Sequence, residues 1–277
     1  MNVTRFAPSP TGPLHLGHAF AALTAAQRGD RFLLRIEDID RPRCKPEWEQ
    51  AIYDDLHWLG LRWETPVLHQ SARQPAYDAA LSQLAGMGLT YHCTCTRADI
   101  RAALSAPQEG ADSGEGPDGP IYPGTCRNAH HTTGAIRLNM AKAMALTGPV
   151  QFTETGGIQG AFAYDADFMT SEIGDVVLAR RDIGASYHLA VTVDDAYQGI
   201  TEVTRGEDLF AATPIHALLQ RLLGLPTPQY HHHRLIRDEA GKRLAKRDDA
   251  RALSRYRAEG ATPADIRRMV GFDKDGA

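Results

Sequence analysis

The segment RFAPSPTGPLHLGH, residues 5–18, constrains the fold more than any other part of the sequence. The residues that lead into it are β-prone, and Pro8 and Pro10 end this short strand because proline lacks a backbone N–H group. An alanine-rich run with helical propensity begins at Leu16, and Gly29 is predicted to end it. A strand, a tight turn and a helix in immediate succession are typical of an α/β protein.

His15 and His18 lie at the predicted start of this helix. The N–H groups and the dipole of a helix N-terminus favour anions, and imidazoles add hydrogen bonds to phosphate oxygens. The alternative is a polar helix cap with two solvated histidines. Taken alone, the pattern His-x-x-His favours the cap.

The following residues repeat the alternation of strand and helix. Residues 32–36 read as a buried strand that ends in acidic residues, and a helix is predicted from Pro46 until Gly60 closes it. Residues 75–88 predict a further helix. We therefore expect a parallel sheet with crossover helices, in which ligands bind beyond the carboxyl ends of the strands.

The pattern changes after Leu89. Residues 105–120 are rich in glycine, proline, serine and acidic side chains and predict a loop, whereas residues 186–206 predict strand and turn. Antiparallel strands are predicted for three segments, residues 135–140, 148–155 and 175–183. An excursion from the α/β pattern is therefore expected in the middle of the chain.

The C-terminal part is predicted to be helical. An amphipathic helix carries Pro214 in its first turn, and Thr262 and Asp265 have the spacing of a capping box around Pro263. Asp194 and Asp195, further upstream, fit a polar turn at a strand end facing the active site better than a metal pair.

Composition places limits on function. The chain has 277 residues, with 43% hydrophobic and 23% charged, which is ordinary for a globular protein. The net charge of −4 argues against a general nucleic-acid coat. From His231 onward, however, 12 lysines and arginines face 8 acidic residues, so a local basic face for phosphates is possible.

The expected compartment follows from segments that the sequence lacks. No apolar run approaches the roughly 18 residues of a membrane span, and no signal peptide is recognisable. Four cysteines do not make a disulfide framework, so a reducing cytoplasm is expected, with no membrane and no obligate protein partner evident.

Three of these cysteines suggest a metal site. Cys93 and Cys95 are separated by one residue, and Cys126 approaches from beyond the polar loop. Thiolates in a reducing compartment favour zinc, which prefers four tetrahedral ligands, so three cysteines leave one position open. Free buried thiols are the alternative.

A basic segment, GKRLAKR, lies far downstream and includes Lys242 and Lys246. By itself such a segment is usually a solvated surface. Together with HLGH, however, RLAKR resembles the paired HIGH and KMSKS signatures of the class I aminoacyl-tRNA synthetases. The resemblance implies that catalysis and ATP binding rest on His15, Gly17, His18 and Lys246, with Mg²⁺ accompanying ATP. Ala245 occupies the place of the usual serine.

RFAPSPTG and RIEDID narrow this resemblance to the glutamyl branch, and most closely to the glutamyl-queuosine tRNA(Asp) synthetases, which are shortened paralogues of glutamyl-tRNA synthetase. The resemblance implies a glutamate pocket made of Arg5, Phe6, Ala7, Pro8, Ser9, Glu37, Tyr187 and Arg205. Arginine suits carboxylates and a buried carboxylate suits an ammonium group. From the residues alone, a structural ion pair between Arg5 and Glu37 fits equally well. The resemblance also implies that Tyr122 completes the zinc site of Cys93, Cys95 and Cys126 in a structural role.

The expected fold is a Rossmann-like parallel-sheet catalytic domain of the class I synthetase type, with an inserted zinc-containing α+β module and a short helical C-terminal segment. The expected boundaries are residues 1–89 for the first half of the catalytic domain, 90–185 for the insertion, 186–230 for the second half and 231–277 for the lysine signature and C-terminal helices. The triple histidine 231–233 is expected to be local structure beside the nucleotide.

The resemblance implies a reaction in two steps. Glutamate and ATP form glutamyl-adenylate, and glutamate then passes to the cyclopentenediol of queuosine at the wobble position of tRNA(Asp). The chain ends soon after RLAKR, where glutamyl-tRNA synthetases continue into an anticodon-reading region, and this favours the queuosine acceptor. The basic C-terminal segment is a candidate for contacting the RNA backbone. The alternatives are a truncated synthetase that charges the tRNA 3′ end and a non-catalytic RNA-binding paralogue.

Overall fold

The parallel sheet predicted for the first part of the chain is present. The computed structural model describes residues 1–105, 114–181, 184–237 and 251–272. Strands β1 (Val3–Phe6), β2 (Arg31–Ile36) and β3 (Glu64–His69) pair in that order and run parallel. Helices α1 (Leu16–Arg28) and α2 (Pro46–Trp58) connect them, which confirms both predicted helix starts.

A second sheet holds the later strands. Strand β12 (Glu202–Gly206) pairs in parallel with β13 (Gln229–His233), which pairs in parallel with β8 (Val150–Glu154). Strand β9 (Gly160–Tyr164) is antiparallel to β8. This sheet therefore combines two strands from residues 150–164 with two strands from residues 202–233.

The two sheets meet at β1 and β12. The Thr201 amide donates to the carbonyl of Val3 at 3.0 Å, and the amide of Val3 donates to Thr201 Oγ1 at 2.8 Å. Helix α1 packs against both strands. The carboxyl ends of β1, β2, β12 and β13 consequently open toward one region, the position where ligands bind in open α/β sheets.

The predicted antiparallel excursion is also present. Strands β11 (Gly184–Ala185), β10 (Val177–Arg180), β7 (Ala135–Leu138) and β4 (Thr90–Cys93) form an antiparallel sheet in that order. Of the residues predicted to form a loop, 106–113 lie outside the described residues, and β5 (Glu115–Gly116) and β6 (Gly119–Pro120) form a small hairpin. The remaining helices are α3 (Gln74–Gly86), α4 (Arg97–Ser105), α5 (Met140–Thr147), α6 (Ala166–Phe168), α7 (Tyr187–Tyr197), α8 (Thr213–Leu223), α9 (Leu253–Ala258) and α10 (Pro263–Met269).

Helix α7 corrects the prediction of strand and turn for residues 186–206, of which only β12 is a strand. β-branched residues such as Val191 and Thr192 favour a strand locally. Burial of the helix overrides that preference, and Ser186 caps it by accepting the Leu189 amide. Asp194 and Asp195 therefore lie on a buried helix and not on a polar turn.

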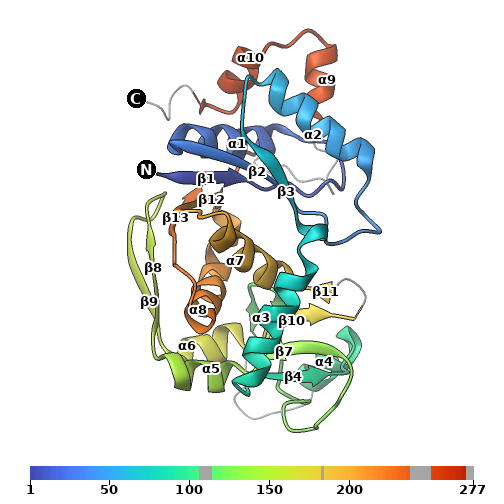
Figure 1. Cartoon of the computed structure of the whole chain (residues 1–277), viewed down its shortest axis with the longest axis vertical. Helices are drawn as coiled ribbons and strands as arrows, with labels where there is room; N and C mark the ends of the chain where they lie inside the picture. Colours follow the sequence, from blue (N-terminus) through green and yellow to red (C-terminus); the bar gives the residue numbers. More distant parts are fainter. Residues whose placement is uncertain (106–113, 182–183, 238–250, 273–277) are drawn as a thin grey trace.

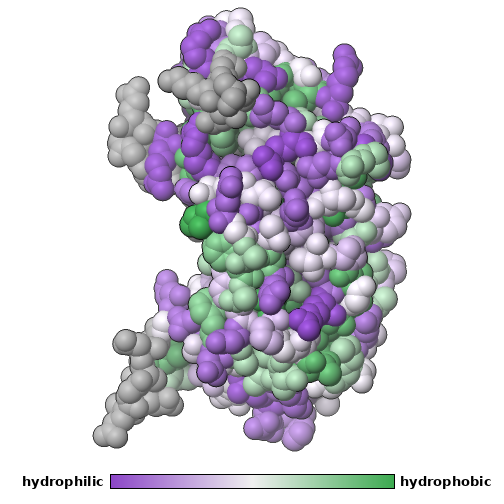
Figure 2. All heavy atoms as spheres, turned by 90° about the vertical axis from the view of Figure 1, so that its left-hand side faces the viewer, coloured by the Kyte–Doolittle hydropathy of each residue, from purple (hydrophilic) through white to green (hydrophobic). Residues whose placement is uncertain are grey.

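The elements form an upper and a lower part (Figure 1). The upper part contains β1 to β3 and α1, with α2, α9 and α10 packed around one hydrophobic core that includes Phe20, Leu56 and Ile266. A second core surrounds α7 and α8. Thr262 and Asp265 form the predicted capping box of α10. Seen from the side, a hollow at mid-height separates the two parts, and hydrophilic side chains dominate the upper one (Figure 2). Within the described residues, no helix is both long and apolar enough to cross a membrane.

Candidate active site

A cavity of about 350 Å³ lies at the carboxyl ends of β1, β2, β12 and β13. Its wall brings together nine of the residues predicted for glutamate or ATP, namely Arg5, Phe6, Ala7, His15, Gly17, His18, Glu37, Tyr187 and Arg205. Pro8 continues the loop after β1, and its carbonyl accepts the Glu37 amide at 3.0 Å. Ser9 follows it, and its carbonyl accepts the amide of Thr11. The roles of these residues remain predictions.

The two histidines cap helix α1 and also face the cavity. His15 Nδ1 accepts the Gly17 amide at 3.1 Å, and His18 Nδ1 accepts the His15 amide at 3.1 Å. Because both Nδ1 atoms accept, each neutral ring carries its proton on Nε2. The cap and the anion site are thus compatible, since capping leaves both imidazoles as N–H donors at a helix N-terminus.

Lys246, the predicted phosphate contact, lies outside the described residues, as do Lys242 and Ala245. The described residues end at Arg237 before this segment and resume at Arg251 after it. Ile236 lines the cavity, and Ala252 forms an isolated β-bridge with His15. Ile236 and Ala252, which lie on opposite sides of the undescribed stretch 238–250, therefore contribute to the cavity and to the histidine loop, respectively.

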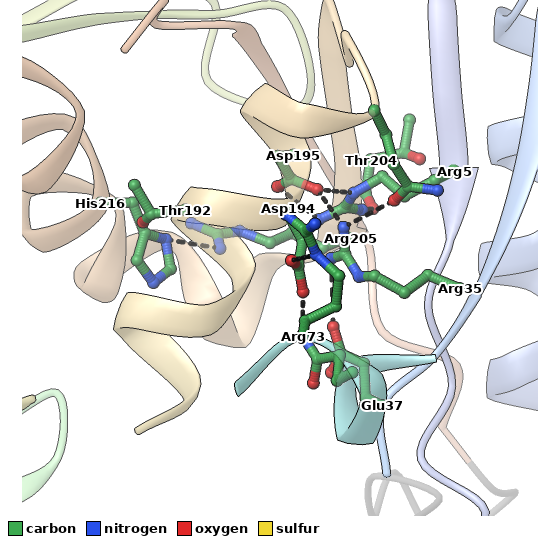
Figure 3. A network of polar contacts seen from close by, with 12 residues as sticks. Arg5, Arg35, Glu37, Arg73, Thr192, Asp194, Asp195, Thr204, Arg205 and His216 are labelled. Carbon is green, nitrogen blue, oxygen red and sulfur yellow. Dashed lines mark hydrogen bonds and ion pairs between the residues drawn. The ribbon is translucent and has the colours of Figure 1, made fainter. Parts of the chain in front are cut away.

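Arg5 does not pair with Glu37, which corrects the alternative of an ion pair between them. Arg5 forms a two-point contact with Asp195 on α7, with N–O distances of 2.9 and 3.2 Å, and donates to the Thr204 carbonyl at 3.1 Å. Arg35 reaches the same carboxylate at 2.6 Å. Figure 3 shows both guanidinium groups converging on Asp195. Their two positive charges hold the Asp195 pKa down to about 2 although burial opposes its ionisation.

Glu37 lies at the end of β2 with its side chain 12% exposed. Burial raises the pKa of this carboxyl, and the neighbouring charges of Arg35, at 3.1 Å, and Arg5 oppose that rise. A largely desolvated carboxylate in a cavity wall suits a ligand ammonium group. Its hydration has already been lost on folding, and the surrounding protein strengthens any new charge pair.

Arg205, in contrast, is buried among uncharged acceptors. Its Nε donates to His232 Nε2 at 3.0 Å, and its two terminal nitrogens donate to His216 Nδ1 at 2.9 Å and Thr213 Oγ1 at 2.8 Å. Burial lowers the pKa of His232 to about 4 and that of His216 well below its usual value, with the Arg205 charge adding to both effects. In the described part of the chain no carboxylate pairs with Arg205, so its positive charge is available to an anionic ligand.

The predicted metal ligands converge in the lower part of the molecule. The sulfurs of Cys93, Cys95 and Cys126 lie within 4.8 Å of one another, and Cys95 Sγ is 3.4 Å from Cys126 Sγ. Tyr122 Oη lies 3.3 Å from Cys93 Sγ and 3.6 Å from Cys95 Sγ. Zn–S bonds of about 2.3 Å place tetrahedral ligands about 3.8 Å apart, so the donor set fits zinc. Among the described residues this is the one cluster with metal-site geometry.

A larger cavity of about 740 Å³ lies between this cluster and α7. Tyr187, the first residue of α7, lines both cavities. Several arginines line the larger one, namely Arg97, Arg101, Arg137, Arg180 and Arg181. The two cavities therefore adjoin at Tyr187, and the larger one has a basic wall.

Sequence reasoning missed the residues that hold the arginines. Asp195 was predicted to lie on a polar turn at a strand end, in preference to a metal pair, and His216 and Thr213 were seen only as part of an amphipathic helix. Ser186, a capping residue directly before the buried run, was the available signal for α7. The triple histidine forms the last three residues of β13, where His233 lines the cavity and His232 accepts a hydrogen bond from Arg205.

The sequence is similar to characterised families. Residues 2–272 match the family described as tRNA synthetases class I (E and Q), catalytic domain. A glutamyl-Q tRNA(Asp) synthetase of Rhodobacter capsulatus is 60% identical over 98% of this chain and all of that protein. One from Nocardia farcinica is 42% identical over 96% of this chain and 82% of that protein.

A solved structure supports the assignment to the class I tRNA synthetases. The glutamate-tRNA synthetase of Elizabethkingia anophelis superposes with a TM-score of 0.73 at 27% identity over 97% of this chain. The chain spans 61% of that structure's length. The chain therefore belongs to the class I tRNA synthetases of the E and Q group, and within it to the glutamyl-Q tRNA(Asp) synthetases.

Proposed function

We propose that this protein activates glutamate with ATP and transfers it to the queuosine cyclopentenediol at the wobble position of tRNA(Asp). The observation that carries the proposal is a single cavity that joins two imidazole donors at a helix N-terminus to a buried arginine, which has no carboxylate partner among the described residues. The relatives' names give the same amino acid and the same tRNA.

Glutamate recognition follows from the charges in the wall. Arg205 binds one substrate carboxylate, because its charge is otherwise uncompensated in the described residues and burial makes an unpaired charge costly. Arg5 supplies further N–H groups, but Asp195 already offsets its charge. Glu37 binds the substrate ammonium, and the Tyr187 hydroxyl completes the pocket.

ATP binds with its phosphates at the start of α1. The Nε2–H groups of His15 and His18 and the side chain of Lys246 stabilise the charge that develops on the α-phosphate. Mg²⁺ brought in with ATP would share the charge of the leaving pyrophosphate. Gly17 leaves room for the His15 ring in this position, since a Cβ there would lie 3.0 Å from the His15 ring.

The proposed reaction has two steps, adenylate formation and acyl transfer. The α-carboxylate of glutamate attacks the α-phosphate, which releases pyrophosphate and leaves glutamyl-adenylate. A queuosine hydroxyl then attacks the acyl carbon, its proton is lost, and AMP leaves. Holding both reactants in one cavity supplies orientation for the first step, and the adjoining basic cavity admits the RNA for the second.

Zinc is proposed for the cluster of Cys93, Cys95, Tyr122 and Cys126, because four donors converge there without a disulfide. The ion would crosslink β4 to the segment that follows the β5–β6 hairpin and would take no part in the chemistry. Reduced thiols suit the cytoplasm, where we place the reaction.

The deciding experiment uses radiolabelled glutamate, ATP and tRNA(Asp) in three forms: with queuosine, without queuosine, and with queuosine but without the terminal adenosine. We expect label on both queuosine-containing forms and none on the unmodified tRNA. Label that requires the terminal adenosine and ignores queuosine would instead identify a synthetase that charges the 3′ end, which the similarity to glutamate-tRNA synthetase favours. Absence of glutamate-dependent exchange of pyrophosphate into ATP would identify a non-catalytic RNA-binding protein.

A further inference from the structure

A chain of hydrogen bonds runs from Arg205 in the candidate active site to Asp118 at the tip of the β5–β6 hairpin. Arg205 donates to His216 Nδ1 at 2.9 Å, and His216 Nε2 lies 2.9 Å from His188 Nδ1. His188 Nε2 lies 2.7 Å from Asp118 Oδ2. The first link of this chain is visible in Figure 3. The chain connects two cavities, because Arg205 lines the smaller one whereas Asp118 and His188 line the larger one.

The direction of every bond in the chain follows from arginine chemistry. A guanidinium group only donates, so His216 Nδ1 accepts and the proton of this neutral ring is on Nε2. That N–H donates to His188 Nδ1, which therefore accepts, and His188 carries its own proton on Nε2. This proton is donated to the Asp118 carboxylate. The four groups thus have a single consistent protonation pattern, in which both imidazoles are neutral and each has one defined tautomer.

Burial makes this pattern costly to disturb. His188 and His216 are 5% and 2% exposed. A buried donor or acceptor that loses its partner forfeits more than the net value of one hydrogen bond, because water does not replace it. The Tyr187 ring also packs edge-on against both imidazoles, at centroid distances of 5.7 and 5.8 Å. Two proposed glutamate-binding side chains, Tyr187 and Arg205, therefore both contact His216, and Tyr187 also contacts His188.

A second branch holds Arg205 from the other side but ends in the interior. His232 Nε2 accepts from Arg205, and His232 Nδ1 contacts Glu154, whose side chain is fully buried. The Asp118 side chain is 51% exposed. Of these two branches, only the one through His188 and His216 reaches the surface, and it does so in the wall of the basic cavity.

We propose that His216, His188 and Asp118 are positioning residues that orient Arg205 for glutamate and couple glutamate affinity to the β5–β6 hairpin. The inference rests on the proposed function, since it takes Arg205 as the carboxylate anchor. We call the hydrogen-bonded chain from Arg205 through His216 and His188 to Asp118 the relay. When the relay is weakened, the Arg205 guanidinium can turn away from the pocket, which weakens glutamate binding and leaves the nucleotide contacts at α1 unchanged.

The test is glutamate-dependent pyrophosphate exchange, which needs no RNA. In Asp118→Ala the KM for glutamate is expected to rise about three- to tenfold, the effect of one lost hydrogen bond, while the KM for ATP stays constant. Asp118→Asn keeps an acceptor for His188 and is expected to restore the wild-type KM. Glu115→Ala is the matched control, because it removes another exposed carboxylate from the same hairpin.

His216→Asn separates a relay from independent local effects. The asparagine amide oxygen can still accept from Arg205, but no group reaches His188. We expect a rise in the glutamate KM similar to that of Asp118→Ala, and no further rise in the double variant, because a relay is broken only once. Additive effects of the two substitutions would overturn the relay.

The outcomes separate this inference from the proposed function. A wild-type protein without glutamate-dependent exchange contradicts the proposed function itself. A wild-type protein that exchanges, with Asp118→Ala equal to Glu115→Ala, overturns the relay alone. An Asp118→Asn variant as impaired as Asp118→Ala also overturns it, since the acceptor would then be irrelevant. Thermal unfolding of each variant identifies any loss of folding. If Asp118→Ala or His216→Asn does not fold, the glutamate KM of Asp118→Asn decides whether the acceptor at position 118 matters.

Discussion

The backbone amide of Leu253 donates to the carbonyl of Leu14 at 2.8 Å. Leu14 directly precedes His15, and Leu253 begins α9 after the lysine segment. This bond and the bridge between His15 and Ala252 fasten the start of the C-terminal helices to the histidine loop. The helix that follows the RLAKR signature in the sequence is therefore hydrogen-bonded to the loop that carries HLGH, whereas RLAKR itself lies outside the described residues.

Removing the Leu253 amide is expected to weaken ATP binding. Leu253→Pro deletes this N–H at the first position of α9, where proline is tolerated in a helix. The buried leucine side chain is also lost, so Leu253→Ala serves as the control that keeps the amide. We expect a higher KM for ATP in Leu253→Pro than in Leu253→Ala, measured by pyrophosphate exchange. Equal values would show that the bond does not position the lysine segment.

Gly17→Ala is expected to impair ATP use through the His15 ring. The new Cβ would lie 3.0 Å from His15 Cε1 and 3.1 Å from Nδ1, which is tighter than most side-chain contacts, so the imidazole must shift by a few tenths of an ångström. Gly86→Ala is the control, because a Cβ at the end of α3 meets nothing within 4 Å. The KM for ATP should rise in Gly17→Ala and stay unchanged in Gly86→Ala. A displaced His15 with an unchanged KM would remove this ring from the phosphate site.

Protonation of Glu37 is expected to weaken glutamate binding at acidic pH. Burial raises its pKa above the ordinary 4.5, so protonation removes the negative charge at a higher pH than for an exposed glutamate. The KM for glutamate is therefore expected to rise as pH falls toward that raised pKa. In Glu37→Gln the KM at pH 7 should be about tenfold higher or more, and this acid limb should disappear. Asp40→Asn, in the same RIEDID segment, should behave as wild type.

One zinc ion per chain is expected, and Cys93→Ser should abolish it because the remaining donors no longer complete a tetrahedron. Cys44→Ser is the matched control, since Cys44 does not belong to the cluster. Elemental analysis of protein purified without chelators measures the stoichiometry, and thermal unfolding should show a lower Tm in Cys93→Ser alone. Metal-free wild-type protein with an unchanged Tm after added zinc contradicts this assignment.

Much of the fold followed from local signals. Strand β1 ends at its proline turn, α1 starts at Leu16, and α10 has its capping box, because each depends on residues close together in the sequence. Contacts between segments that are distant in the sequence could not be predicted from local signals. The parallel contact between β8 and β13, and the burial that makes residues 187–197 helical, depend on partners distant in sequence.

The site was predicted in part for a related reason. Signature residues such as His15 and Glu37 could be recognised by type and context, and the structure brings them into one cavity. Their supports could not be recognised, because Asp195 and His216 act through geometry between elements and have no motif of their own. The assignment of Lys246 remains a prediction.

In the proposed reaction, one cavity holds the amino acid and the phosphates of ATP together. A crystal structure with a non-hydrolysable glutamyl-adenylate analogue measures this directly. We expect a glutamyl carboxylate on Arg205, the ammonium at Glu37, and the acyl-phosphate mimic within hydrogen-bond distance of His15 or His18. An analogue bound with its glutamyl group away from Arg205, or with its adenylate in the basic cavity beside Tyr187, would contradict the account.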